Sequence, residues 1–156
     1  MAGTSYELWL RPADGAGLGE AVDAAWSHPD LDREAQTART PAGRVPCEVA
    51  ADGGLTVALP MAALERVLPD IWYPVDGYEQ NRGWREPLDV WLTKVADHVA
   101  RAVPIRCGLI GLGVARHPDR DGDGDEVPPE REVSYLVPGR QGGAVRYPPT
   151  RWYTPW

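Results

Sequence analysis

Residues 87–115 read PLDVWLTKVADHVARAVPIRCGLIGLGVA and contain the strongest pattern in the chain, a helix followed directly by a strand. Apolar residues recur every three or four positions, while Asp89, Lys94 and Asp97 fall on the opposite side. The spacing predicts a helix over 87–102 that exposes Asp89 to water. Pro87 suits its first turn, and Pro104 cannot continue it. The predicted buried stripe consists of Leu88, Trp91, Leu92, Val95, Val99, Ala102 and Val103.

The strand predicted after this helix is apolar on both sides. Cys107 and Leu109 alternate with Ile110 and Leu112, and neither set is polar. This pattern is typical of a central strand that is covered on both faces. The glycines at 108, 111 and 113 lie inside the strand with no helix after them, so they do not predict a nucleotide-binding loop.

The rest of the chain predicts an α+β fold. In order, we expect a strand over 5–12, a helix over 18–26, a hairpin of 44–49 with 55–59, a short helix over 60–68 and a strand over 132–137. Residues 30–43 are polar and patternless, which predicts a loop. This order favours a mixed or antiparallel sheet of about five strands with helices packed on one face. The preferred topology is a ferredoxin-like split βαβ arrangement with an added C-terminal hairpin strand.

Length and composition favour one compact unit. The 156 residues predict a single α+β domain over 1–156, with an acidic hairpin loop at 117–131 and an irregular aromatic tail at 138–156. Neither a signal-peptide pattern nor a long apolar run stands out, so we expect a cytoplasmic protein. Cys47 and Cys107 lack CxxC spacing and are interpreted as buried structural thiols.

The charge distribution favours a basic protein partner. The net charge is −7, and residues 117–132 alone hold seven acidic side chains against two arginines. Because nucleic-acid binding depends on clustered Lys and Arg, this balance argues against a nucleic-acid partner, and no membrane contact is expected. An acidic surface instead steers a basic protein toward it. The sequence leaves open whether the chain forms a homo-oligomer.

Residues 70–86, DIWYPVDGYEQNRGWRE, are predicted to form a long aromatic loop. Amphipathic aromatics beside an arginine are typical of protein interfaces. The same aromatics could instead pack down to complete a small core, and both interpretations stay open. The predicted partner-binding residues are Trp72, Tyr73, Tyr78, Glu79, Arg82 and Trp84.

One motif predicts a metal site. Residues 119–130, DRDGDGDEVPPE, fit the spacing D-x-D-x-D-G-x5-E. This spacing resembles the calcium loop of EF-hand proteins, and the resemblance implies oxygen ligands from Asp119, Asp121, Asp123, the carbonyl of Asp125 and Glu130. A strand is predicted before the loop, and Pro128-Pro129 near the end of the loop prevent the exiting helix, so a complete EF-hand is excluded. The alternative is a solvated acidic hairpin tip.

These patterns favour a non-catalytic bacterial cytosolic protein-binding module with an acidic and aromatic surface. In size, acidity and α+β pattern the chain is similar to the small antitoxin and immunity-type proteins of bacteria, and the richness in Ala, Gly, Pro, Arg and Asp is typical of high-GC bacterial genomes. His28, His98 and His117 have no nucleophile at a recognised spacing and are interpreted as surface residues. No cofactor is expected apart from calcium. The alternative is a small enzyme or a calcium-dependent module that uses the Asp119–Glu130 loop.

Overall fold

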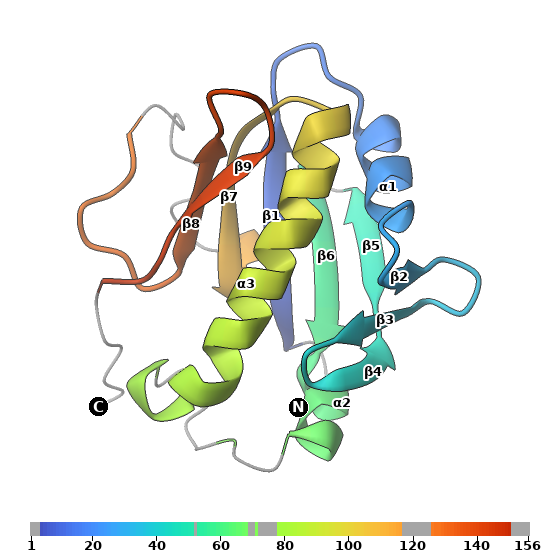
Figure 1. Cartoon of the computed structure of the whole chain (residues 1–156), viewed down its shortest axis with the longest axis vertical. Helices are drawn as coiled ribbons and strands as arrows, with labels where there is room; N and C mark the ends of the chain where they lie inside the picture. Colours follow the sequence, from blue (N-terminus) through green and yellow to red (C-terminus); the bar gives the residue numbers. More distant parts are fainter. Residues whose placement is uncertain (1–3, 52, 69–70, 72–77, 117–125, 151–156) are drawn as a thin grey trace.

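A six-stranded antiparallel sheet forms the body of the protein (Figure 1). The computed structural model describes residues 4–51, 53–68, 71, 78–116 and 126–150. The strand order is β5-β6-β1-β7-β8-β9. The strands are β1 (Ser5–Pro12), β5 (Glu48–Ala51), β6 (Leu55–Pro60), β7 (Ile105–Leu112), β8 (Ser134–Pro138) and β9 (Ala144–Tyr147).

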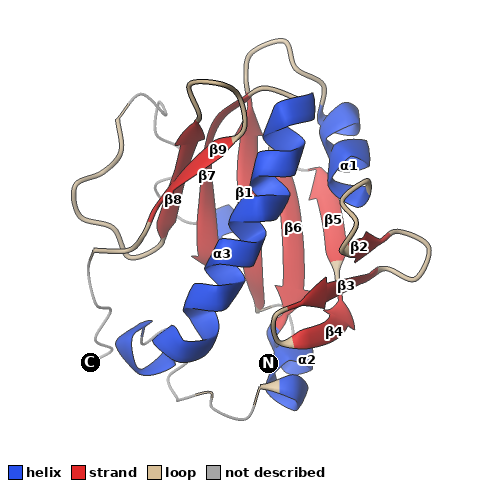
Figure 2. Cartoon of the chain, in the orientation of Figure 1, coloured by secondary structure: helices blue, strands red, loops and turns tan. Residues whose placement is uncertain are grey.

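Three helices pack against this sheet, and α1 and α3 lie side by side in front of it (Figure 2). They are α1 (Leu18–Trp26), α2 (Met61–Val67) and α3 (Tyr78–Ala102). The α+β class predicted from the sequence is confirmed. Within the sheet, β5-β6-β1-β7 has the order of a split βαβ core, since β1 lies between the two strands β6 and β7 that α2 and α3 connect. The strands β8 and β9 extend this core.

The central position of β7 is confirmed. It pairs with β1 on one side and with β8 on the other. Ile110 belongs to the core under the helices, whereas Cys107 and Leu109 belong to a smaller cluster on the opposite face. Val114, Val127 and Val133 join that smaller cluster, so the described ends of the connection from β7 to β8 pack on the second face.

The helix α3 begins at Tyr78, and the prediction of a start at Pro87 was wrong. Pro87 lies inside the helix. A proline removes one helical hydrogen bond but otherwise adopts helical φ angles, so helix can precede it when packing compensates. Here Trp84 and Leu88 are buried on either side of the proline and provide that packing. Residues 78–86 are therefore helix and not loop. Ala102 is exposed, which also departs from the predicted stripe.

Residues 30–43, predicted as a loop, instead contribute to a second sheet. Its strands, in the order β2-β3-β4, are β2 (Leu31–Asp32), β3 (Thr37–Thr40) and β4 (Gly43–Pro46). Ala38 and Val45 pair across it and are buried in the main core, which explains why so polar a segment is ordered. The predicted strand over 44–49 is consequently divided at Cys47 between the two sheets.

The C-terminal region also contains more regular structure than the sequence predicted. Residues 144–147 form the strand β9 and pair with β8, whereas an irregular tail was expected over 138–156. A short 3-10 helix, η1 (Val114–Arg116), follows β7. Most of the predicted acidic loop, residues 117–125, lies outside the described residues. Across the described helices, none is long and apolar enough to cross a membrane.

Candidate functional site

The helix α3 buries a row of polar side chains against the sheet. Asn81, Arg85 and Asp89 are 0%, 3% and 1% exposed. Their spacing of four residues places them on one side of the helix. The prediction that Asp89 faces water was therefore wrong. The signal that could have revealed this row is the four-residue spacing itself, but it begins in a segment that was predicted to be a loop.

Asp89 is the centre of a polar cluster that joins four elements. Its carboxylate accepts hydrogen bonds from the hydroxyl of Tyr6 on β1 and, at 3.0 Å, from the hydroxyl of Ser134 on β8. Arg146 on β9 lies 3.6 Å from the same carboxylate and donates to the Ser134 hydroxyl at 3.1 Å. The charge of Asp89 is thus balanced by donors from the sheet.

Arg85 and Trp84 complete this polar cluster on the helix side. The Arg85 guanidinium lies 5.4 Å from the ring centroid of Tyr6, and its Nε donates to the Tyr6 hydroxyl at 3.4 Å. Trp84 meets the Tyr6 ring edge-on at 5.6 Å and donates its indole N–H to Asn81 at 2.6 Å. We call Tyr6, Asn81, Trp84, Arg85, Asp89, Ser134 and Arg146 the polar cluster.

Burial determines the protonation chemistry of the polar cluster. It raises the pKa of Asp89 to about 6, although the Tyr6 hydrogen bond and the Arg85 charge act in the opposite direction. Burial likewise raises the pKa of Tyr6 well above its ordinary value, and the neighbouring Asp89 charge raises it further. A carboxyl group with such a pKa can exchange a proton close to neutral pH.

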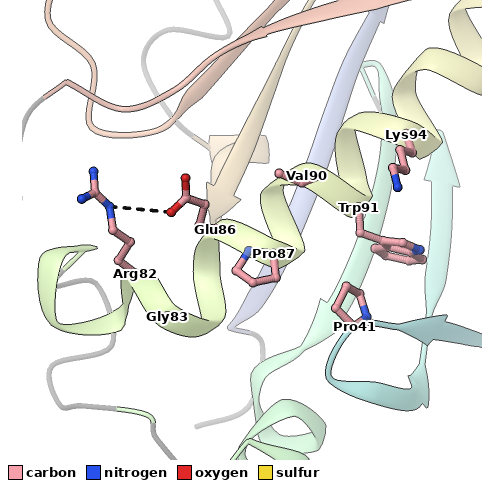
Figure 3. Close-up of a pocket in the computed structure, with 8 residues that line it drawn as sticks. All are labelled: Pro41, Arg82, Gly83, Glu86, Pro87, Val90, Trp91 and Lys94. Carbon is pink, nitrogen blue, oxygen red and sulfur yellow. Dashed lines mark ion pairs between the residues drawn. The ribbon is translucent and has the colours of Figure 1, made fainter.

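A groove lies on the other side of α3, between the helix and the β3–β4 turn (Figure 3). Its volume is about 650 Å³. Val90 is 43% exposed, whereas Trp91 is only 5% exposed and donates its indole N–H to Asp30 at 3.0 Å. We call this pocket the α3 groove; its lining is Pro41, Arg82, Gly83, Glu86, Pro87, Val90, Trp91 and Lys94.

The charged rim of the α3 groove is formed by α3 itself. Arg82 and Glu86 are both 53% exposed and form an ion pair at 3.9 Å, one helical turn apart. Lys94 lies farther along the helix (Figure 3). The groove therefore combines an apolar floor with a polar rim, which is the composition of many binding surfaces.

A second pocket of about 590 Å³ lies at one end of the sheet. It is more polar than the α3 groove, and Tyr147 at its edge is 40% exposed with Arg131 lying 5.8 Å from its ring centroid. No polar-cluster residue lines either of these two pockets. The second pocket is lined by Ala13, Asp14, Ile105, Arg106, Val127, Val137, Pro138 and Tyr147.

The residues predicted to bind a partner are divided by the structure. Trp72 and Tyr73 lie outside the described residues, as do the side chains of Tyr78 and Glu79. Arg82 is exposed on the rim of the α3 groove. Trp84 is 6% exposed and belongs to the core, so the alternative of aromatics that complete the core applies to this residue.

Most of the predicted calcium ligands lie outside the described residues, namely Asp119, Asp121, Asp123 and Asp125. Glu130 is described and exposed. In the part of the chain that the structure describes, no group of three His, Cys, Asp or Glu side chains is arranged to hold a metal ion. Cys47 and Cys107 are both buried free thiols, as predicted, and burial raises the pKa of Cys47 to about 12.

Two histidines meet where α3 packs on α1. His98 is half-buried rather than on the open surface, and its ring lies 5.2 Å from that of His28. His98 Nε2 also lies 2.8 Å from the hydroxyl of Ser27. That hydroxyl donates to the carbonyl of Ala24 at 2.6 Å, so it accepts from His98 and is not activated as a nucleophile.

Neither protein-family models, curated proteins nor solved structures give a match to this chain.

Proposed function

We propose that this chain is a non-catalytic protein-binding module, that the α3 groove is its docking face and that its partner is a basic protein. Bacterial antitoxins and immunity proteins act in this way, and a role of that type suits the small size and acidity of the chain. The observation that carries the proposal is the exposed Val90, which together with Pro41 and Pro87 lines a groove of about 650 Å³.

The floor of the α3 groove suits an apolar anchor from a partner. Pro41, Pro87, Val90 and Trp91 all line the groove, Pro41 from the β3–β4 turn and the other three from α3 (Figure 3). A single exposed valine is ordinary on a protein surface, but adjoining apolar residues within a concave site are typical of binding sites. Pro41 and Pro87 also have fixed φ angles, so a partner would order little backbone there.

The negative net charge of the chain affects how the partner approaches, and not its contacts with the groove floor. The net charge of −7 attracts a basic protein over long range and raises its association rate. At the rim, Arg82 and Glu86 form an ion pair with each other, which leaves Lys94 as the cation of the lining with no ion pair assigned in the described part of the chain. A basic partner would therefore contact the groove through apolar atoms and place its charges outside the rim.

A catalytic role for the polar cluster has less support. Its carboxyl group could transfer protons, but Asp89 is 1% exposed and Tyr6 is fully buried. A substrate must reach within hydrogen-bond distance of a general acid or base. Neither of the two described pockets gives a substrate that access.

Matched valine substitutions test the proposal. The immobilised chain should capture a basic protein from a lysate of its own organism, and Val90→Asp should abolish that capture. Val67→Asp is the control, because Val67 is 39% exposed on α2, away from the groove lining, and its variant should retain the partner. The association rate measured with the purified partner should fall as salt increases. Equal capture by both variants would contradict the groove as docking face.

The calcium-dependent alternative rests on the spacing of residues 119–130. If this loop binds calcium, isothermal titration should give heat for the wild-type chain and none for an Asp121→Asn, Asp123→Asn double variant, since both carboxylates are ligands in the pattern. Absence of heat and of a thermal shift in the wild-type chain would remove this alternative.

A further inference from the structure

The two edge strands of the six-stranded sheet, β9 and β5, differ in how their outer sides are closed (Figure 1). At β9, the backbone N–H of Ala144 donates to the carboxylate of Asp97 on α3 at 3.0 Å. Pro148, which has no N–H, directly follows the strand. A covering helix and a proline are common ways to protect an edge strand against pairing with another chain. The strand β5 contains no proline, so its outer side depends on its other contacts.

The pairing of β6 with its two neighbours determines which backbone groups of β5 point outward. In an antiparallel pair, residues that exchange backbone hydrogen bonds alternate with residues that do not. The N–H of Met61 donates to the carbonyl of Thr4, so in the same register Val57 also bonds to β1. Val49 lies opposite Val57, and Ala51 lies two residues farther along β5. The N–H and C=O groups of Val49 and Ala51 therefore point away from β6.

The residue before β5 has the same orientation. The N–H of Cys47 points outward and donates to the carbonyl of Gln36, in the turn between β2 and β3, at 2.9 Å. Within the residues that the structure describes, no such bond reaches the outward groups of Val49 or Ala51. We call these outward N–H and C=O groups of Val49 and Ala51 the β5 edge. The β2–β3 turn closes the side of the sheet as far as Cys47, and the β5 edge is open beyond it.

The side chains of β5 determine which kind of segment suits the β5 edge. Val49 packs against the main core on the side of the helices but is only half-buried, and α1 contacts the strand (Figure 2). An apolar side chain on an added strand, opposite Val49, would extend this core. Glu48 and Ala50 alternate with Val49, so they point to the other face of the sheet, where both are exposed. On that face, an added strand would place its side chains beside a carboxylate.

The surroundings of the β5 edge are acidic. Glu48 is exposed on the strand itself, and the neighbouring β2–β3 hairpin adds the exposed Asp32 and Glu34. The nearby arginines, Arg33 and Arg44, bond to side chains of their own region. Opposite charges on neighbouring strands stabilise their pairing, and like charges destabilise it. The charges therefore favour a segment whose side chains on the Glu48 face are basic.

We propose that the β5 edge binds an extended segment of a partner as an additional strand of the sheet. The segment has alternating apolar and basic side chains, the apolar ones on the side of Val49 and the basic ones on the side of Glu48. Backbone hydrogen bonds to Val49 and Ala51 provide affinity, and the alternation of side chains provides specificity. No residue of β5 lines the α3 groove, so the β5 edge acts independently of the docking face proposed above.

Two synthetic peptides of equal composition test the proposal on the whole chain. The probe is five Lys-Val repeats, and the control is five lysines followed by five valines. Both have the same charge, so the general attraction to an acidic chain acts on both. Fluorescence anisotropy should give a Kd for the alternating peptide that is lower by roughly tenfold, as expected for a few additional hydrogen bonds. Equal Kd values for the two peptides would overturn the proposal.

Hydrogen exchange measured by NMR locates the bound peptide. Saturation with the alternating peptide should slow exchange at the amides of Val49 and Ala51 by roughly tenfold or more, because both N–H groups become hydrogen-bonded. Unchanged exchange at these two amides would contradict strand addition. Exchange that slows there with protein concentration alone, without peptide, would assign the β5 edge to a second copy of the chain and would also overturn the proposal.

Two substitutions at one position separate backbone pairing from side-chain contacts. Ala51→Pro removes one outward N–H at a place where an edge strand tolerates proline, and it should weaken binding of the alternating peptide by roughly tenfold. Ala51→Val keeps the N–H and should retain the affinity. Urea unfolding shows whether both variants are folded under the binding conditions. Equal affinity of the two folded variants would count against the proposal. Val90→Asp in the α3 groove should leave peptide binding unchanged, which separates this test from that of the docking face.

Discussion

Each side of α3 carries some residues that a simple amphipathic helix would place on the other side. The side against the sheet carries the polar row Asn81, Arg85 and Asp89, each at most 3% exposed. The side toward the groove carries Pro87 and Val90, and Val90 is 43% exposed. Polarity alone therefore does not tell which side of this helix is buried. What decides is whether partners exist for the polar groups and whether neighbours cover the apolar ones.

The buried side shows how a carboxylate is accommodated in a core. A buried charge is costly unless hydrogen bonds and an opposite charge compensate it. Asp89 has two hydroxyl donors and an arginine, supplied by three different strands. On the groove side no such compensation is needed, because an exposed apolar side chain costs little. The contrast suggests that the first side specifies the fold and that the second is free to serve binding.

The largest expected effect comes from comparing two neighbouring apolar residues of α3, one buried and one exposed. Trp91→Ala should lower the free energy of unfolding by about 3–5 kcal/mol, because it removes a large buried aromatic. Val90→Ala, one residue away on the exposed side, should cost less than about 0.5 kcal/mol. Urea unfolding of both variants measures the difference. A loss of unfolding free energy below about 1 kcal/mol for Trp91→Ala would mean that the Trp91 side chain does not pack in the core.

A tyrosine pair sharpens the comparison on the buried side. Tyr6→Phe removes a hydroxyl that donates to the buried carboxylate and should cost about 1.5–3 kcal/mol, the range for hydrogen bonds to charged groups. Tyr147→Phe removes the same atom from a side chain that is 40% exposed and should be nearly neutral. Equal unfolding free energies for the two variants would show that the Tyr6 hydroxyl does not stabilise Asp89.

Between pH 7.5 and 4.5, the pH dependence of the free energy of unfolding should be dominated by Asp89 on the buried side of α3. The native pKa of Asp89, about 6, lies above its ordinary 3.8, so the folded state binds the proton more tightly than the unfolded state. Its contribution is fully present below pH 3.8 and is lost as pH rises through 6. Between pH 7.5 and 4.5 the chain should gain about 2 kcal/mol from this group.

Comparison with Asp89→Asn isolates that gain. Asp30 and Asp97 have lowered pKa values, so they contribute stability that is lost as pH falls, with a slope of the opposite sign at lower pH. The difference between the two unfolding curves cancels these shared terms. Parallel curves from pH 7.5 to 4.5 would contradict the raised pKa of Asp89.

Much of the fold could be predicted from hydrophobic periodicity. The strands over 5–12 and 105–112 and the helix over 18–26 have repeated apolar spacing, and the structure contains them. The second sheet could not be predicted in this way, because Ala38 and Val45 are buried by neighbours distant in sequence. The extension of α3 to Tyr78 was missed because Pro87 resembles a helix start, and only tertiary packing shows that it is not.

The candidate site was harder to predict than the fold. Arg82 was identified as a surface residue, but Trp84 beside it is buried, since residues two positions apart on a helix face different sides. Because residues 70–86 were interpreted as a loop, helical periodicity was not applied to them. The prediction therefore could not distinguish the exposed Arg82 from the buried Trp84. The polar cluster was missed because its members come from positions as distant as Tyr6 and Arg146, whose proximity depends on strand order.

Pro87 has a consequence for the chemistry of the α3 groove. It has no N–H, so the helix cannot supply the usual hydrogen bond to the carbonyl of Gly83 one turn earlier. Both residues line the groove, and Gly83 has no side chain to shield its own backbone. The groove lining thus includes one backbone carbonyl without its usual donor four residues later in the helix. A docked segment that brings an N–H to this carbonyl would gain both a hydrogen bond and a fixed register along α3.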